Sequence, residues 1–247
     1  AAFGHAQPIA QVERQARCAK APVGGVESRI HPGILATPTA EKNLQPDRSE
    51  SKSLSCFDFS ASRERTLRLV HLAFGGAAFL VPALGRPGSI ALAAAALLYN
   101  VLLAPALGWD RGYRRAAEPR FAGIGSYPLA VLLLLCVAPL HVAMAAWGVL
   151  AVGDPAAATA GNRWSSPFLP WNRVKTWLGS LAALVGGSLA AAVLLLYAGA
   201  VDGPGAAVGP GLAAGAAGAL AESLPWPVDD NLPVAAAAAA ALVLAGA

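Results

Sequence analysis

Long apolar runs separated by short polar stretches fill the chain from about residue 69 onward. Several of them approach the roughly 20 residues that a helix needs to cross the hydrocarbon core of a bilayer. The pattern predicts an all-α, polytopic membrane helix bundle of about seven transmembrane helices. Because the first and last runs are short and the break at Pro139 is minimal, six or eight spans are also compatible with it. The runs cover 69–85, 88–108, 122–138, 140–160, 177–200, 205–223 and 233–247.

Residues 1–62 have a different character, since they are rich in Pro, Ser, Gln and charges of both signs. They contain no apolar run long enough to span a membrane or to bury a core, which is typical of disordered segments. We therefore predict a mostly disordered polar tail over residues 1–62, followed by a multi-span membrane domain over residues 63–247.

The composition of the whole chain agrees with a membrane protein. Of its 247 residues, 56% are hydrophobic and only 13% are charged, and 26 are Gly. Small residues let transmembrane helices approach closely. The formal charge of +4 does not indicate a nucleic-acid partner, because the basic residues fall at the ends of apolar runs, as in cytoplasmic loops. Three widely spaced cysteines predict neither a disulfide framework nor a metal site.

Basic residues also predict the orientation of the helices. If the loop after Asp154 is cytoplasmic, ten of the eleven Lys and Arg residues from Arg63 onward lie on that side, and only Arg86 lies outside. This agrees with the positive-inside rule. The same parity brings the loop 153–180 and the turn 224–232 to one membrane surface. We therefore expect an integral, multi-pass membrane protein, in the inner membrane if it is bacterial, with these polar segments facing the cytoplasm.

The loop 153–180 holds the first candidate chemistry. Asp154 could hold Mg²⁺, which takes one or two carboxylates together with phosphate oxygens. Arg173 and Lys175 precede Thr176 and Gly179, and a helix N-terminus beside a Lys favours an anion such as phosphate. The alternative is that these are ordinary helix-end residues at the head-group level.

The second candidate region is the acidic turn at Asp229, Asp230 and Asn231, with Glu222 upstream of it. Two adjacent carboxylates and an amide suit a metal contact or a base that accepts a hydroxyl proton. A Pro-flanked turn of this composition is often only a turn. Arg68 and His71, at the start of the first apolar run, are weaker candidates of the same kind.

Together these motifs resemble those of the dolichol kinase and phytol kinase family. That family includes bacterial diacylglycerol and polyprenol kinase-like proteins and is distantly related to phosphatidate cytidylyltransferases. The resemblance covers roughly residues 65–247. Its motifs are Arg68-x-x-His71, Gly153-Asp154 with the Ala-rich run to Gly161-Asn162-Arg163, Lys175-Thr176-Trp177-Leu178-Gly179-Ser180, Glu222-Ser223 and Asp229-Asp230-Asn231-Leu232-Pro233.

The resemblance implies a kinase that uses CTP as phosphoryl donor, Mg²⁺ as divalent metal, and a membrane lipid alcohol as acceptor. It implies catalytic roles for Asp154, Lys175 and Asp230. The chain departs from the family pattern at Pro155, where a small residue is usual, and at Asn162, where a basic residue is usual. The implied metal ligands are Asp154 and Asp229, and the implied nucleotide-binding residues are Arg163, Arg173, Thr176, Gly179 and Asn231.

Two other functions stay open at this stage. One is a phosphatidate cytidylyltransferase, which also uses CTP but forms a CDP-lipid and pyrophosphate. The other is a non-catalytic membrane protein whose polar loops are only interfacial.

Overall fold

The computed structural model describes residues 66, 68–108, 125–227 and 229–247, and these residues are all-helical apart from turns and loops. The predicted tail, and the segment 109–121 between the second and third apolar runs, lie outside the described residues. Residues 68–76 are helical and lead into the elements that follow. These are η1 (Ala77–Leu80), α3 (Val81–Leu98), η2 (Tyr99–Leu103), α4 (Ala104–Ala106), α5 (Ser126–Val137), α6 (Leu140–Arg163), α7 (Trp177–Tyr197), α8 (Pro204–Ser223) and α9 (Asn231–Leu244).

Three helical segments are long and apolar enough to cross a membrane, judged by length and composition. They are Arg68–Ala106, Leu140–Arg163 and Trp177–Tyr197, while α5 and α9 are shorter apolar helices. The helical fold predicted from the apolar runs is therefore confirmed in the described residues, but the predicted count of seven spans is not.

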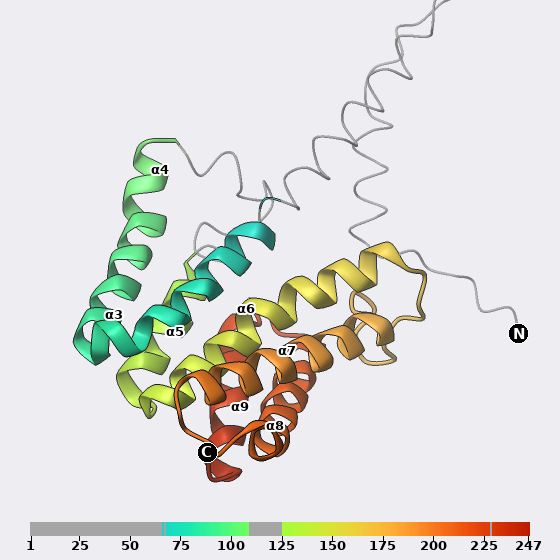
Figure 1. Ribbon diagram of the computed structural model, residues 1–247. Coiled ribbons are helices and arrows are strands. Elements are labelled where there is room, and N and C mark those ends of the chain that lie inside the picture. The colour runs from blue at the N-terminus through green and yellow to red at the C-terminus, as the bar shows by residue number, and fades with distance from the viewer. Residues whose placement is uncertain (1–65, 67, 109–124, 228) are drawn as a thin grey trace, which may run out of the picture. The chain divides into compact units, whose positions relative to one another are not determined.

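The first of these segments is bent at Gly85. Its φ of 63° and ψ of 179° lie outside the helical region, and Pro87 follows two residues later. A residue with a side chain rarely adopts such a φ, so Gly allows the chain to turn here. The bend separates the two predicted runs 69–85 and 88–108, and Figure 1 shows the two legs meeting at a sharp turn.

Small residues set the spacing of the helices that carry the site. A Cβ added at Gly148 of α6 would collide with Leu194 of α7, and one added at Gly215 of α8 would collide with Ser188 of α7. Close approach of this kind replaces the hydrophobic effect as a source of packing between helices in lipid. In Figure 1, α6 and α7 run alongside each other, with α8 and α9 packed beneath them.

The junction between α5 and α6 is held by a charged side chain. Ala138 is extended and Pro139 precedes the first residue of α6, so the last carbonyls of α5 lack helical partners. The Arg86 guanidinium donates to two of these carbonyls, at 2.6 Å to Leu135 and 2.9 Å to Ala138. Arg86 thus caps the C-terminus of α5.

Candidate functional site

Segments far apart in the sequence converge on Lys175, which lies in the loop between α6 and α7. Its Nζ donates to Glu222 Oε1 at the end of α8 and to Asp230 Oδ2 at the start of α9, both at 2.8 Å. The Glu222 side chain is only 6% exposed, whereas those of Lys175 and Asp230 are each 28% exposed. One ammonium group therefore links two helices through a partly buried pair of carboxylates.

The loop 164–176 is folded tightly enough to hold Lys175 in this position. The Leu169 amide donates to the Lys175 carbonyl at 2.9 Å, and the Trp177 amide donates to the Pro167 carbonyl at 3.1 Å. Leu169 is buried and anchors this turn. Asn172, also buried, donates to the carbonyl of Ser223 at 3.0 Å. The loop is thus attached to the end of α8, next to Glu222.

The charge state of Lys175 follows from its neighbours. Burial by itself lowers the pKa of Lys175, but the carboxylates of Glu222 and Asp230 more than offset it and raise the pKa above its ordinary value. The side chain therefore stays an ammonium at every physiological pH.

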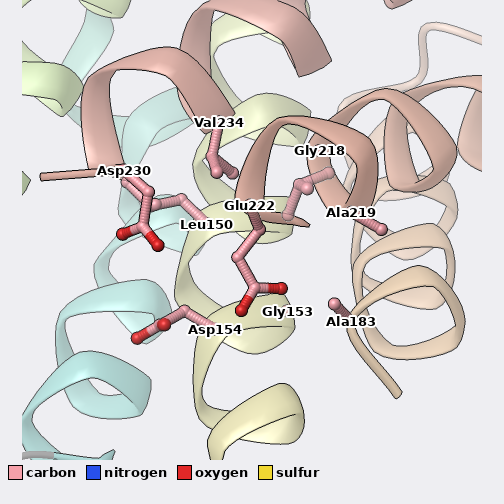
Figure 2. Close-up of a pocket in the computed structure, with 10 residues that line it drawn as sticks. Leu150, Gly153, Asp154, Ala183, Gly218, Ala219, Glu222, Asp230 and Val234 are labelled. Carbon is pink, nitrogen blue, oxygen red and sulfur yellow. The ribbon is translucent and has the colours of Figure 1, made fainter. Parts of the chain in front are cut away.

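Beside this pair lies a small hollow lined by three carboxylates, those of Asp154, Glu222 and Asp230. Figure 2 shows the three side chains, which come from α6, α8 and the start of α9, around the same space. Its other walls are apolar or backbone, with Val149, Leu150, Gly153, Ala183, Gly218, Ala219 and Val234. Within the described residues, Glu222 Oε2 is buried and has no hydrogen-bond partner. Such an atom is costly to leave unpaired.

Asp154 lies inside α6, which includes Pro155 and continues to Arg163. Its Oδ2 is 4.0 Å from Nδ1 of His71 on the first helix. The imidazole of His71 in turn meets Tyr127 edge-on, with ring centroids 4.6 Å apart. The start of the first apolar run, singled out in the sequence for Arg68 and His71, therefore adjoins the hollow.

The two carboxylates of the acidic turn have different hydrogen-bond partners. Asp229 accepts hydrogen bonds from Ser126 Oγ and from the amide of Asn231, both at 2.8 Å. The buried Asn231 side chain donates to the same Ser126 hydroxyl at 2.9 Å. Asp229 and Asn231 thus fix the turn against the start of α5, and Asp230 is the member of the turn that reaches Lys175.

The predicted nucleotide-binding residues lie around the same loop. Thr176 is the N-cap of α7, and its hydroxyl accepts from the Gly179 amide at 3.1 Å. Gly179 packs closely on α6, since an added Cβ would lie 3.2 Å from the Ala157 carbonyl oxygen. Arg163, the last residue of α6, and Arg173 are exposed. Thr176 and Gly179 therefore have structural tasks, and a nucleotide role for any of these four residues stays a prediction.

The residues can be tested for their fit to Mg²⁺. The part of the chain that the structure describes contains no group of three or more His, Cys, Asp or Glu side chains arranged to hold a metal ion. Mg²⁺ needs only one or two protein carboxylates, with water and phosphate as its other ligands. The unpaired oxygen of Glu222 beside Asp154 meets that smaller requirement.

The sequence analysis named Glu222 beside the acidic turn and in one motif but gave it no role, whereas the structure makes it a partner of Lys175. A signal was present, because Glu222 is the only charged residue in the apolar run 205–223. An ionisable residue inside such a run is costly unless it is used.

Comparisons with known proteins add one relative. No family model matches the chain, and no solved structure matches it. The chain is similar to a farnesol kinase. This relative, "Farnesol kinase, chloroplastic" of Arabidopsis thaliana, is 33% identical over 90 residues, which make up 34% of this chain and 29% of the relative. The match thus covers less than a third of the relative's length.

Proposed function

We propose that this protein is a membrane kinase that transfers a phosphoryl group from CTP to a lipid alcohol. The observation that carries the proposal is the position of Lys175, held between Glu222 and Asp230 and beside Asp154, in a helical chain similar to a farnesol kinase. Carboxylates that can bind Mg²⁺, beside one ammonium group, suit a polyanionic donor, and the adjoining apolar helices suit an apolar acceptor.

The reaction would be an in-line displacement at the γ-phosphorus of CTP. The acceptor hydroxyl forms the new P–O bond, the bond to the β-phosphate oxygen breaks, and CDP leaves. Catalysis of this kind depends mainly on positioning and on neutralising charge. Mg²⁺ would supply part of that neutralisation. Lys175 would supply a fixed positive charge for the phosphates, and Asp230 would accept the hydroxyl proton.

The acceptor would reach the site from the lipid. Exposed apolar side chains cover α7, including Leu181, Val185 and Leu189, as expected for a helix in contact with acyl chains. Trp171 and Trp177 are about half exposed and stack edge-on near the start of α7, with centroids 5.7 Å apart. Aromatic residues of this kind favour the head-group level of a bilayer. The hydroxyl of a long-chain alcohol would lie at the same depth, on the cytoplasmic side.

The test is a product assay with the purified protein in detergent micelles. CTP labelled at the γ-phosphate is supplied with Mg²⁺ and a panel of acceptors, namely farnesol, phytol, a polyprenol and diacylglycerol. We expect a labelled lipid phosphate together with CDP, and its loss in Asp154→Asn and Lys175→Ala. Asp202→Asn, in the turn between α7 and α8, is the control and should keep full activity.

Two results would overturn the proposal. A CDP-lipid and pyrophosphate from phosphatidate would identify a cytidylyltransferase. No product with any acceptor or nucleoside triphosphate, and no binding of CTP, would favour a non-catalytic membrane protein.

A further inference from the structure

We propose that Glu222 and Asp154 together form the seat of the divalent cation, with Glu222 binding through Oε2. This inference rests on the proposed function, since it names the residues that would hold the metal of that reaction. It assigns to Glu222 a direct role that the sequence motifs gave to Asp229.

The first argument is the unpaired oxygen. Glu222 Oε1 accepts from Lys175, while Oε2 is buried and has no hydrogen-bond partner in the described residues. A buried carboxylate oxygen without a partner is destabilising. A cation in the adjacent hollow would supply the missing interaction.

The second argument is the balance of charge. Asp154, Glu222 and Asp230 all line the hollow, whereas one ammonium group, that of Lys175, contacts two of them. His71 lies 4.0 Å from Asp154. Carboxylates gathered in an apolar setting repel one another unless positive charge compensates them. A divalent cation bound by Asp154 and Glu222 would add to the positive charge of Lys175, and its remaining coordination positions would be open to water and phosphate oxygens.

Lys175 would then act as the positioning residue for this seat. By holding Oε1 of Glu222 and Oδ2 of Asp230 at 2.8 Å each, it restricts the Glu222 carboxylate to one orientation. The oxygen that remains is the one available to a ligand in the hollow. Asp229 is less suited to this role, because one of its oxygens accepts a hydrogen bond from Ser126 and the other accepts one from the Asn231 amide.

The experiment measures binding of Mn²⁺, as a substitute for Mg²⁺, by electron paramagnetic resonance. The full chain in detergent micelles is titrated without nucleotide and again with CDP, which can supply phosphate oxygens. We expect one bound Mn²⁺ per chain in wild type. Both Glu222→Gln and Asp154→Asn should weaken it at least about tenfold, since loss of even an outer-shell partner typically costs 10–100-fold. Asp229→Asn should stay within about twofold of wild type.

Folding is checked separately, because Glu222→Gln also changes a partner of Lys175. Helix content and the melting temperature are recorded for each variant, and Glu222→Asp, which keeps a carboxylate, serves as a second test. Partial recovery of Mn²⁺ affinity in Glu222→Asp relative to Glu222→Gln supports the seat. Unchanged Mn²⁺ binding in a folded Glu222→Gln protein, or loss of binding in Asp229→Asn alone, would overturn it.

The outcome is independent of the assay for kinase activity. If Mn²⁺ binding depends on Glu222 but no lipid phosphate is formed from CTP, the proposed function fails and the cation seat stands. If lipid phosphate is formed while the affinity for Mn²⁺ does not depend on Glu222, the proposed function stands and this assignment fails.

Discussion

Arg86 and Lys175 are both basic residues at breaks between helices, but their side chains donate hydrogen bonds to different kinds of acceptor. Arg86 donates to two main-chain carbonyls at the end of α5. Lys175 donates to two carboxylates from α8 and α9, beside a third carboxylate and an unpaired oxygen. The carbonyls need only a donor, and Arg86 meets that need completely.

The difference separates structural charge from candidate functional charge. A guanidinium on orphan carbonyls completes a helix end and leaves nothing for a ligand. The acidic group around Lys175 leaves one buried oxygen, Glu222 Oε2, without a hydrogen-bond partner in the described residues, which is unfavourable for folding alone. We therefore expect changes at Arg86 to affect stability alone, and changes at Lys175 to affect activity as well as stability.

The largest effect is expected from Lys175→Met. Loss of the ammonium leaves Glu222 and Asp230 without their shared partner, which should cost about 3 kcal/mol of stability because removing one member of a buried pair strands the other. The proposed lipid kinase activity should fall roughly 10²–10³-fold, as for other lost charge-stabilising groups. Thermal melting of the protein in detergent micelles measures the stability, and the rate of lipid phosphate formation measures the activity.

Lys175→Arg is the matched control. It keeps the charge, so most of the stability should return, but the planar guanidinium differs in geometry and activity should recover only in part. Full activity in a folded Lys175→Met protein would contradict the comparison.

Arg86→Met should have the second largest effect, and on stability alone. Two carbonyls of α5 lose their donor, which should lower the free energy of unfolding by about 1–3 kcal/mol. Lipid phosphate formation, measured below the melting temperature, should stay within about twofold of wild type. A loss of activity comparable to that of Lys175→Met, without unfolding, would place Arg86 with the functional charges.

Most of the helical fold could be predicted from hydrophobic pattern alone. The run predicted over 177–200 corresponds to α7 at Trp177–Tyr197, and that over 205–223 to α8 at Pro204–Ser223. Apolar runs of this length have few alternatives to a helix in lipid. The number of membrane crossings could not be obtained in the same way, because short helices such as α5 and α9 can be buried by their neighbours or can cross.

Less of the site could be predicted. The motif resemblance implied roles for Asp154, Lys175 and Asp230, and the structure places Lys175 against Asp230 with Asp154 at the adjoining hollow. Sequence spacing did not reveal that Glu222 shares Lys175, because that contact joins residues 47 positions apart and depends on how the loop folds onto α8. Nor did it separate Asp229 from Asp230, which are adjacent in sequence but face different partners.

Lys175 should keep its stabilising effect up to the ordinary pKa of a lysine. The neighbouring carboxylates raise its pKa, so the effect is complete below the ordinary value of about 10.4 and is lost only as pH rises through the raised value. The lower melting temperature of Lys175→Met relative to wild type should therefore persist from pH 7 to about pH 10. Disappearance of this difference between about pH 8 and 10 would show that Lys175 loses its proton there and would contradict the raised pKa.

The smallest effect concerns Thr176, which the motif resemblance gave to the nucleotide and the structure gives to the N-cap of α7. Thr176→Val removes the hydroxyl that accepts from the Gly179 amide, and should cost about 1 kcal/mol of stability. Thr176→Ser, which keeps the hydroxyl, should retain stability and the KM for CTP. If Thr176→Val raises the KM for CTP at least tenfold while Thr176→Ser does not, the hydroxyl also contacts the nucleotide. If the KM is unchanged in both, Thr176 belongs with Arg86 among the residues that complete a helix end.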